Sequence, residues 1–143
     1  MEMVDANWGS DPRFGDGVTF RFVRAETGDL SARRCLIPAS EFHMGSGRKR
    51  YRAMLDGGNF FYLAGIWEPA LAGWPLSYRI ITASANADIA PYQDRHGAII
   101  HRRQVMQWFD GSIDAQALQA PLLANTFAVE KIGMTRSKKP LLL

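Results

Sequence analysis

The chain has little cysteine and no long apolar run. Its 143 residues include one cysteine, Cys35, which excludes an intramolecular disulfide and any site built from several cysteines. No stretch approaches the roughly 20 apolar residues of a membrane-spanning helix, and the first residues lack the basic and apolar regions of a signal peptide. These absences predict a cytoplasmic protein with no membrane partner and a core held by burial alone.

Most catalytic and metal-binding templates are absent as well. There is no CxxC, HExxH, P-loop or GxSxG motif, and the three histidines, His43, His96 and His101, lack the spacing of a closed metal site. We therefore predict no metal and no cofactor. Ser46 and Lys49 match the SxxK pattern of serine acyl-enzymes, but the glycines and cations around them favour a flexible turn.

The hydrophobic content of 47% and charged content of 22% are typical of one compact domain, which we expect to span residues 1–143. Short runs of alternating apolar and polar residues favour strands through most of the chain. The Asp-Gly-Gly turn at 56–58 predicts a β-hairpin between its two flanking strands. Strands are expected over residues 18–23, 34–37, 51–55, 59–67, 77–82 and 126–132, with a short one ending at 99–100.

Two short helices are expected late in the chain. Residues 101–109 place apolar side chains at near-helical spacing and stop at an Asp-Gly pair, and Ser112 is the candidate cap of a second helix over 113–120. The loop 86–97 is long enough to indicate a functional role. The predicted fold class is α+β, a mainly antiparallel sheet or partly closed barrel with two short helices packed on it.

Positive charge is concentrated in one segment. The net charge of the chain is +3, yet residues 33–52 alone hold six basic side chains and one acidic side chain. Such a cluster either binds the phosphates of a nucleic acid, with an affinity that depends on salt, or forms a solvated hairpin tip that keeps the protein soluble. Both interpretations stay open at this point. The six basic residues are Arg33, Arg34, Arg48, Lys49, Arg50 and Arg52.

Cys35 also has two interpretations. A thiolate is a strong nucleophile, and Arg33 and Arg34 beside it favour the charged form. The apolar residues that follow, Leu36 and Ile37, instead indicate a buried strand cysteine that acts as a small hydrophobe. We favour the buried cysteine.

Several short motifs occur in a fixed order along the chain. They are a Trp-Gly pair at Trp8, the stretch RAET from Arg24, the string RCLIPAS from Arg34 with Phe42 after it, the strand 61–67, Thr82-Ala83 with Asn86, and the loop IAPYQDR from Ile89. In this order, over about residues 8–131, they resemble the SRAP family, the SOS response-associated peptidases, whose members act on abasic sites in single-stranded DNA.

The resemblance implies a covalent chemistry. In the family, a cysteine directly after the initiator methionine captures the abasic-site aldehyde through its α-amine and thiol, and it also makes the members self-processing peptidases. An asparagine, a glutamate and a histidine complete the site. In this chain the position of the cysteine is Glu2, and the other three positions fall on Phe22, Met44 and Gln93. None of these last three side chains exchanges a proton near neutral pH.

Three neighbouring residues are candidates to replace the missing groups, namely Glu41, His96 and Cys35. Glu41 lies three residues before Met44, and His96 lies three residues after Gln93. In an extended strand such an odd offset points a side chain to the opposite face. The alternatives are therefore a degenerate site, or an active enzyme that uses relocated residues or an N-terminus further upstream.

The resemblance retains residues suited to hold DNA. Arg24 matches an arginine positioned to bind a phosphate, and Trp8 matches a groove tryptophan on which a base can stack, with a core aromatic as the alternative. Arg95 is either a DNA contact or part of an ion pair that shapes its loop, and Glu26 has a similar role. We predict a non-catalytic module that binds single-stranded or damaged DNA, and a protein-interaction domain with no nucleic-acid role is the third possibility. Further DNA contacts are expected from Arg48, Lys49 and Arg50.

Overall fold

Strands make up most of the structure, which is a computed structural model that describes residues 2–14, 21–30 and 33–134. The strands are β1 (Asn7–Trp8), β2 (Phe22–Arg24), β3 (Arg34–Ala39), β4 (Phe42–Ser46), β5 (Lys49–Leu55), β6 (Phe61–Glu68), β7 (Ser77–Ser84), β8 (Arg95–Gly97), β9 (Ile99–Ile100) and β10 (Phe127–Met134). The helical elements are the 3-10 turns η1 (Pro12–Phe14) and η2 (Arg102–Gln104) and the helices α1 (Val105–Asp110) and α2 (Ala115–Gln119). The α+β class is confirmed.

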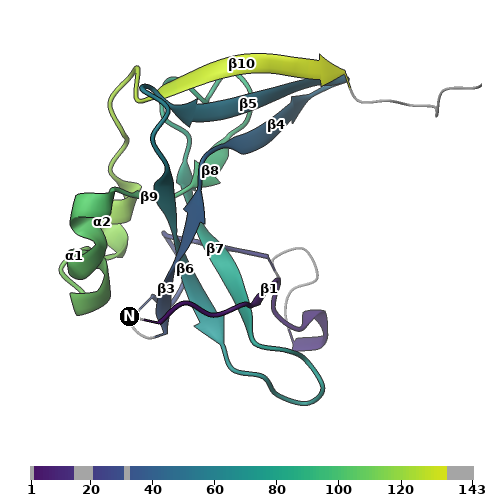
Figure 1. Cartoon of the computed structure of the whole chain (residues 1–143), viewed down its shortest axis with the longest axis vertical. Coiled ribbons are helices and arrows are strands. Elements are labelled where there is room, and N and C mark those ends of the chain that lie inside the picture. The colour runs from purple at the N-terminus through teal and green to yellow at the C-terminus, as the bar shows by residue number, and fades with distance from the viewer. Residues whose placement is uncertain (1, 15–20, 31–32, 135–143) are drawn as a thin grey trace, which may run out of the picture.

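The strands form two sheets. In the seven-stranded sheet the order is β1-β7-β6-β3, with β2 and β8 also paired to β7 and β9 paired to β6. The three-stranded sheet has the order β10-β5-β4 and lies across the top of Figure 1, with α1 and α2 at the left. Strands β1 and β2 run parallel to β7, and the other pairs are antiparallel. Over the described residues the two sheets do not close into a barrel.

The expected hairpin around the Asp-Gly-Gly turn is wrong. Strand β5 pairs with β4 and β10, whereas β6 pairs with β3, β7 and β9, so the turn carries the chain from one sheet to the other. Gly57 and Gly58 have φ angles of 99° and 76°, which glycine adopts without steric cost. The amide of Asp56 donates to the carbonyl of Thr126, so the turn is joined to the segment before β10 instead of to β6.

Several strand boundaries differ from the expectation, by two residues or fewer in β5, β6, β7 and β10. Strand β3 does not stop before Pro38 but continues to Ala39. Among the described strands β3 pairs with β6 alone, and an edge strand tolerates a residue that has no amide hydrogen to donate. The strand expected over 18–23 falls partly outside the described residues, and the described part forms β2.

The cap of the second helix is Asp114, not Ser112. The Asp114 carboxylate accepts a hydrogen bond from the amide of Ala117 at 2.8 Å, which is the N-cap geometry. Ser112 instead donates through its amide and hydroxyl to the Asp110 carboxylate. The end of the first helix is as predicted, because Gly111 follows it in the left-handed conformation. No helix in the described part of the chain is long and apolar enough to span a membrane.

Two hydrophobic cores lie on the seven-stranded sheet. The first packs the sheet against the helices around Trp108, which is fully buried. The second joins the two sheets, where Phe42 contacts Phe61 and Phe127 edge to face at centroid distances of 6.5 and 5.4 Å. This arrangement leaves β1 and β2, on the far edge of β7, outside the contact between the sheets.

The expected loop 86–97 is shorter in the structure, because residues 95–97 form β8, and its other residues are ordered by internal hydrogen bonds. The Asn86 side chain is buried, and its oxygen accepts from the amides of Asp88 and Ile89. The Asp88 carboxylate accepts from the amides of Asn125 and Phe127 at 2.8 and 3.0 Å. These bonds join the loop to the start of β10, which gives Asn86 and Asp88 a structural role.

Arg34 connects the first core to the helices. Its guanidinium lies 4.1 Å from the centroid of the Trp108 ring and donates to the backbone carbonyls of Leu30, Trp108 and Ile113 at 2.6–2.9 Å. The Trp108 indole in turn donates to the carbonyl of Cys35 at 2.9 Å. The structure therefore gives Arg34 an internal structural role.

We predict that Arg34→Lys lowers the free energy of unfolding by about 1–3 kcal/mol. An ammonium has no planar face to stack on Trp108 and cannot reach three separate carbonyls in the same way, and each lost hydrogen bond costs about 0.5–1.5 kcal/mol. Urea unfolding followed by circular dichroism measures the change. The control is Arg33→Lys, at an exposed position where we expect a change of at most about 0.5 kcal/mol. Equal effects of the two substitutions would contradict the role of Arg34.

Candidate nucleic-acid interface

Strand β2 presents two exposed side chains on one face. It runs parallel to β7, with Phe22 opposite Ile80 and Arg24 opposite Thr82. Val23 between them packs against the first core, whereas Phe22 and Arg24 are exposed. Because side chains alternate along a strand, the burial of Val23 turns Phe22 and Arg24 outward together.

Glu26 lies between two guanidinium groups next to β2. Arg95 binds both oxygens of the Glu26 carboxylate at 2.8 and 2.9 Å, and it also donates to the hydroxyl and the carbonyl of Thr82. Arg24 approaches the same carboxylate at 3.5 Å, and its side chain remains 62% exposed. The hydrogen bonds from Arg95, and to a lesser extent Arg24, hold the pKa of Glu26 below its ordinary value although burial opposes this. Arg95 is thus occupied internally, and Arg24 faces solvent.

Trp8 stands beside Phe22 on the same edge of the sheet. The two rings meet edge to face, with centroids 5.5 Å apart and an interplanar angle of 89°. The Trp8 indole donates to the carbonyl of Arg21 at 3.0 Å, and the Arg21 guanidinium lies 5.1 Å from the Trp8 ring centroid. Trp8 is 39% exposed, so it is not enclosed in a core.

Of the other positions that the SRAP resemblance assigns to catalysis, Met44 and Gln93 carry no proton-transfer group. Glu2 is exposed near the start of the chain. Met44 is 2% exposed and belongs to the core between the sheets. The Gln93 side chain donates to the carbonyl of Arg95 at 2.7 Å. The structure describes no bond that joins any two of Glu2, Met44 and Gln93.

Glu41 and His96 have separate partners. The Glu41 carboxylate contacts the Nε2 atom of His43 at 2.6 Å and Arg52 at 3.8 Å. His96 is buried and accepts a hydrogen bond from the amide of Asn86. No hydrogen bond or ion pair links Glu41 to His96, both of which are described, so the structure does not pair them for proton transfer.

The environment of His96 favours the neutral ring. Its Nδ1 atom lies 2.8 Å from the carbonyl of Gly97, and Nε2 lies 3.3 Å from the amide of Asn86, so the proton sits on Nδ1. Phe42 stacks against the ring at a centroid distance of 6.1 Å. Burial, and secondarily the charge of Arg95, lower the pKa of His96 below its ordinary value, while the bond to Gly97 opposes them.

Cys35 is a strand cysteine in a partly buried place on β3. Burial raises the pKa of the thiol to about 11, despite the arginines beside it in sequence. Arg34 does not offset this effect of burial, because its guanidinium points to Trp108 and three carbonyls. A thiol with so high a pKa is a poor nucleophile at neutral pH.

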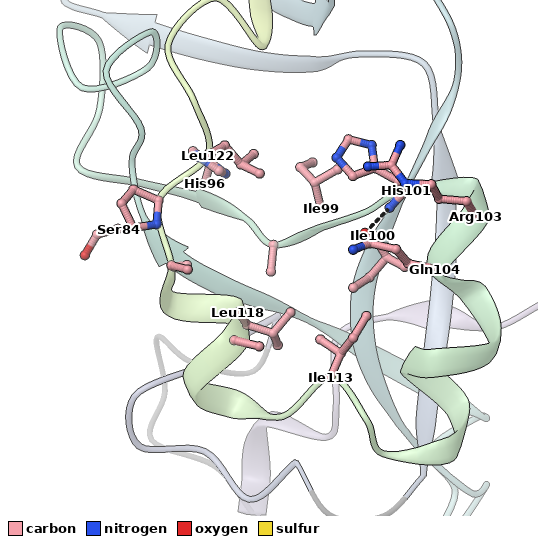
Figure 2. A pocket seen from close by; sticks show the side chains of 15 residues that line it. Ser84, His96, Ile99, Ile100, His101, Arg103, Gln104, Ile113, Leu118 and Leu122 are labelled. Atoms are coloured by element: carbon pink, nitrogen blue, oxygen red, sulfur yellow. Dashed lines mark hydrogen bonds between the residues drawn. The ribbon is translucent and has the colours of Figure 1, made fainter.

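A half-open cavity of about 320 Å³ lies between β8, β9 and the helices. Figure 2 shows His96 at one end and His101 with Arg103 at the other. Its lining contains neither Phe22 nor Arg24, so this cavity is separate from the β2 face. The apolar side chains labelled around it are Ile99, Ile100, Ile113, Leu118 and Leu122.

The cations of the basic segment divide into two groups. Besides Arg34, which is held internally, Arg52 is engaged in surface ion pairs with Glu41 and Glu130. The others that lie on the β4–β5 hairpin are exposed around its turn, so the flexible-turn interpretation of the SxxK sequence holds. These exposed residues are Arg48, Lys49 and Arg50.

Comparison with known families matches residues 27–139 to the model of the SOS response associated peptidase (SRAP) family. The chain belongs to the SRAP family. This membership supports an SOS-associated, peptidase-like domain related to DNA damage, and it confirms the resemblance seen in the motifs. Among curated proteins, none matches this chain.

Two solved structures have a similar fold. The SRAP chain is similar to a crystal structure of a protein from Bacteroides thetaiotaomicron, with 21% identity and a TM-score of 0.71 over 89% of this chain and 68% of that one. It is also similar to a protein from Bordetella bronchiseptica, with 19% identity and a TM-score of 0.61 over 70% of this chain. The chain covers 55% of the length of that second protein.

Sequence reasoning missed two features of this SRAP interface. The motif comparison identifies Phe22 only as the replacement of an asparagine. The alternation of side chains along a strand, with the apolar Val23 facing the core, predicts that Phe22 lies on the exposed face. The contact between Arg21 and Trp8 had no sequence signal, because 13 residues separate them.

We predict that Cys35 resists alkylation in the folded protein. A pKa of about 11 instead of 9.0 lowers the thiolate population at pH 8 by about a hundredfold. Iodoacetamide labelling followed by mass spectrometry measures the rate, with the same protein unfolded in guanidinium chloride as the control. Equal rates in the folded and unfolded states would show that the fold does not suppress the reactivity of the thiol and would reopen its role as a relocated nucleophile.

Proposed function

We propose that this SRAP domain holds single-stranded DNA, including strands with abasic sites, by non-covalent contacts in the response to DNA damage. The proposal rests on the family and on the side chains at its reactive positions. Phe22, Met44 and Gln93 cannot act as acid or base. The candidate substitutes also fit this view, since Cys35 has a raised pKa and His96 has no carboxylate partner among the described contacts.

The observation that carries the proposal is the exposed guanidinium of Arg24 beside Glu26. Two cations, Arg24 and Arg95, share the single negative charge of that carboxylate, which leaves a net positive charge at the end of β2. Arg95 already neutralises Glu26 with two short bonds, so Arg24 can turn to a phosphate without leaving the carboxylate unpaired. A guanidinium binds phosphate in a bidentate manner, which suits this position.

The exposed cations at the β4–β5 turn add further positive charge. Arg48, Lys49 and Arg50 have no role in the cores, and they lie beside the end of β10 at the upper right of Figure 1. In our proposal they attract the DNA backbone over a distance, while Arg24 fixes its position.

We predict that Arg24→Ala weakens binding to a fluorescein-labelled oligothymidylate about tenfold, because one charge-assisted hydrogen bond to phosphate is lost. Fluorescence anisotropy titrations at several salt concentrations measure the affinity and its salt dependence. The slope of the logarithm of affinity against the logarithm of salt concentration should fall by about 0.7, the value for one phosphate contact in a single strand. The fold should persist, because Arg95 keeps Glu26 paired.

The matched control is Arg102→Ala, which removes an exposed arginine from η2. Its guanidinium lies 4.8 Å from the centroid of Phe60, so it too sits beside an exposed aromatic ring. We expect this variant to bind as the parent does, apart from a small change due to net charge. Unchanged affinity of Arg24→Ala, or an equal loss in Arg102→Ala, would contradict the proposed site.

A further inference from the structure

Two large aromatic rings lie exposed side by side on one edge of the seven-stranded sheet. Trp8 is 39% exposed and Phe22 is 41% exposed, and they meet edge to face at 5.5 Å. Neither ring belongs to either hydrophobic core. Exposed aromatic pairs next to cations are a common feature of surfaces that bind single-stranded nucleic acid, because every base has a π-face on which a ring can stack.

The backbone holds the Trp8 ring in place. The amides of Asn7 and Gly9 donate to carbonyls of Leu76 and Tyr78, which fixes the two-residue strand β1 along β7. The indole nitrogen donates to the Arg21 carbonyl, so the polar end of the ring is satisfied. A ring that is fixed before binding loses little conformational entropy when a base stacks on it.

Phe22 and Arg24 are spaced to bind neighbouring parts of one strand. Two residues along β2 separate them by about 6.5 Å, and both face outward. A base on Phe22 would therefore place its backbone near the guanidinium of Arg24. The same strand thus offers a stacking surface and a phosphate contact in direct succession.

We propose that Trp8 and Phe22 form a stacking site for an intact unpaired base, so that this chain prefers intact single-stranded DNA to DNA without bases. The inference rests on the proposed function and specifies its ligand. Phe22 stands where the SRAP resemblance expects an asparagine of the abasic-site chemistry. At this position an asparagine of the abasic-site chemistry is thus replaced by the aromatic ring of Phe22, which gains a stacking contact only when a base is present.

The test compares two short strands with the same number of phosphates. One is an oligothymidylate of about eight nucleotides, a length within the range of single-strand site sizes, and the other consists of stable tetrahydrofuran abasic units. The abasic strand keeps the backbone charge and cannot form a covalent adduct. We expect the parent protein to bind the thymidylate about tenfold more tightly than the abasic strand, as loss of one stacked base implies.

The variants Phe22→Asn and Trp8→Ala should reduce this preference to about twofold or less, with the salt dependence unchanged. Phe22→Tyr keeps an aromatic face and should keep the preference. The matched control is Phe60→Ala, because Phe60 is also 41% exposed, meets Tyr62 edge to face at 5.6 Å and has Arg102 4.8 Å from its ring centroid. That variant should behave as the parent does.

The outcomes separate the two proposals. Equal affinity of the parent for both strands, with strong salt dependence, would overturn the stacking site and leave the proposed function intact. Loss of the preference in Phe60→Ala but not in Phe22→Asn would place the stacking surface elsewhere and overturn the assignment. Failure of the parent to bind either strand would overturn the proposed function together with this inference.

Discussion

The two bonds from Arg95 to the carboxylate of Glu26 fix the part of the molecule on which its proposed function depends. Arg95 begins β8 and also donates to Thr82 on β7, while Glu26 lies in the turn that follows β2. This single side chain therefore ties the short edge strand β2 to the sheet across β7. It adds a side-chain link to the three residue pairs between β2 and β7 and to the burial of Val23, which together set the outward positions of Phe22 and Arg24.

The sequence predicts the class of fold well because the strands and helices are local features. Alternating side chains indicate the long strands, and Gly111 marks the end of the first helix where the structure has it. Sheet membership is not local. The turn with Gly57 and Gly58 reads as a hairpin, yet each flanking strand gains more by pairing with strands distant in sequence and burying Phe61 between the sheets.

Similar reasoning explains what sequence could and could not say about the candidate site. The motifs identify the family, and they locate Arg24 and the substitutions at Phe22 and Met44. They do not reveal which cations are already occupied: Arg34 is stacked on a buried tryptophan, whereas Arg24 is exposed, although both are arginines on short strands. Local sequence carries no signal for such a difference, because their partners lie on other elements.

The proposed function of this SRAP domain is to bind single-stranded DNA without forming a covalent bond to it. The measurement that tests this claim most directly is incubation with a single-stranded oligonucleotide carrying one abasic site, resolved in parallel on native and denaturing gels. We predict a shifted band on the native gel that disappears on denaturation. A band that survives denaturation would show that a covalent adduct forms and that the chain has rebuilt the site from other residues, which would contradict the account.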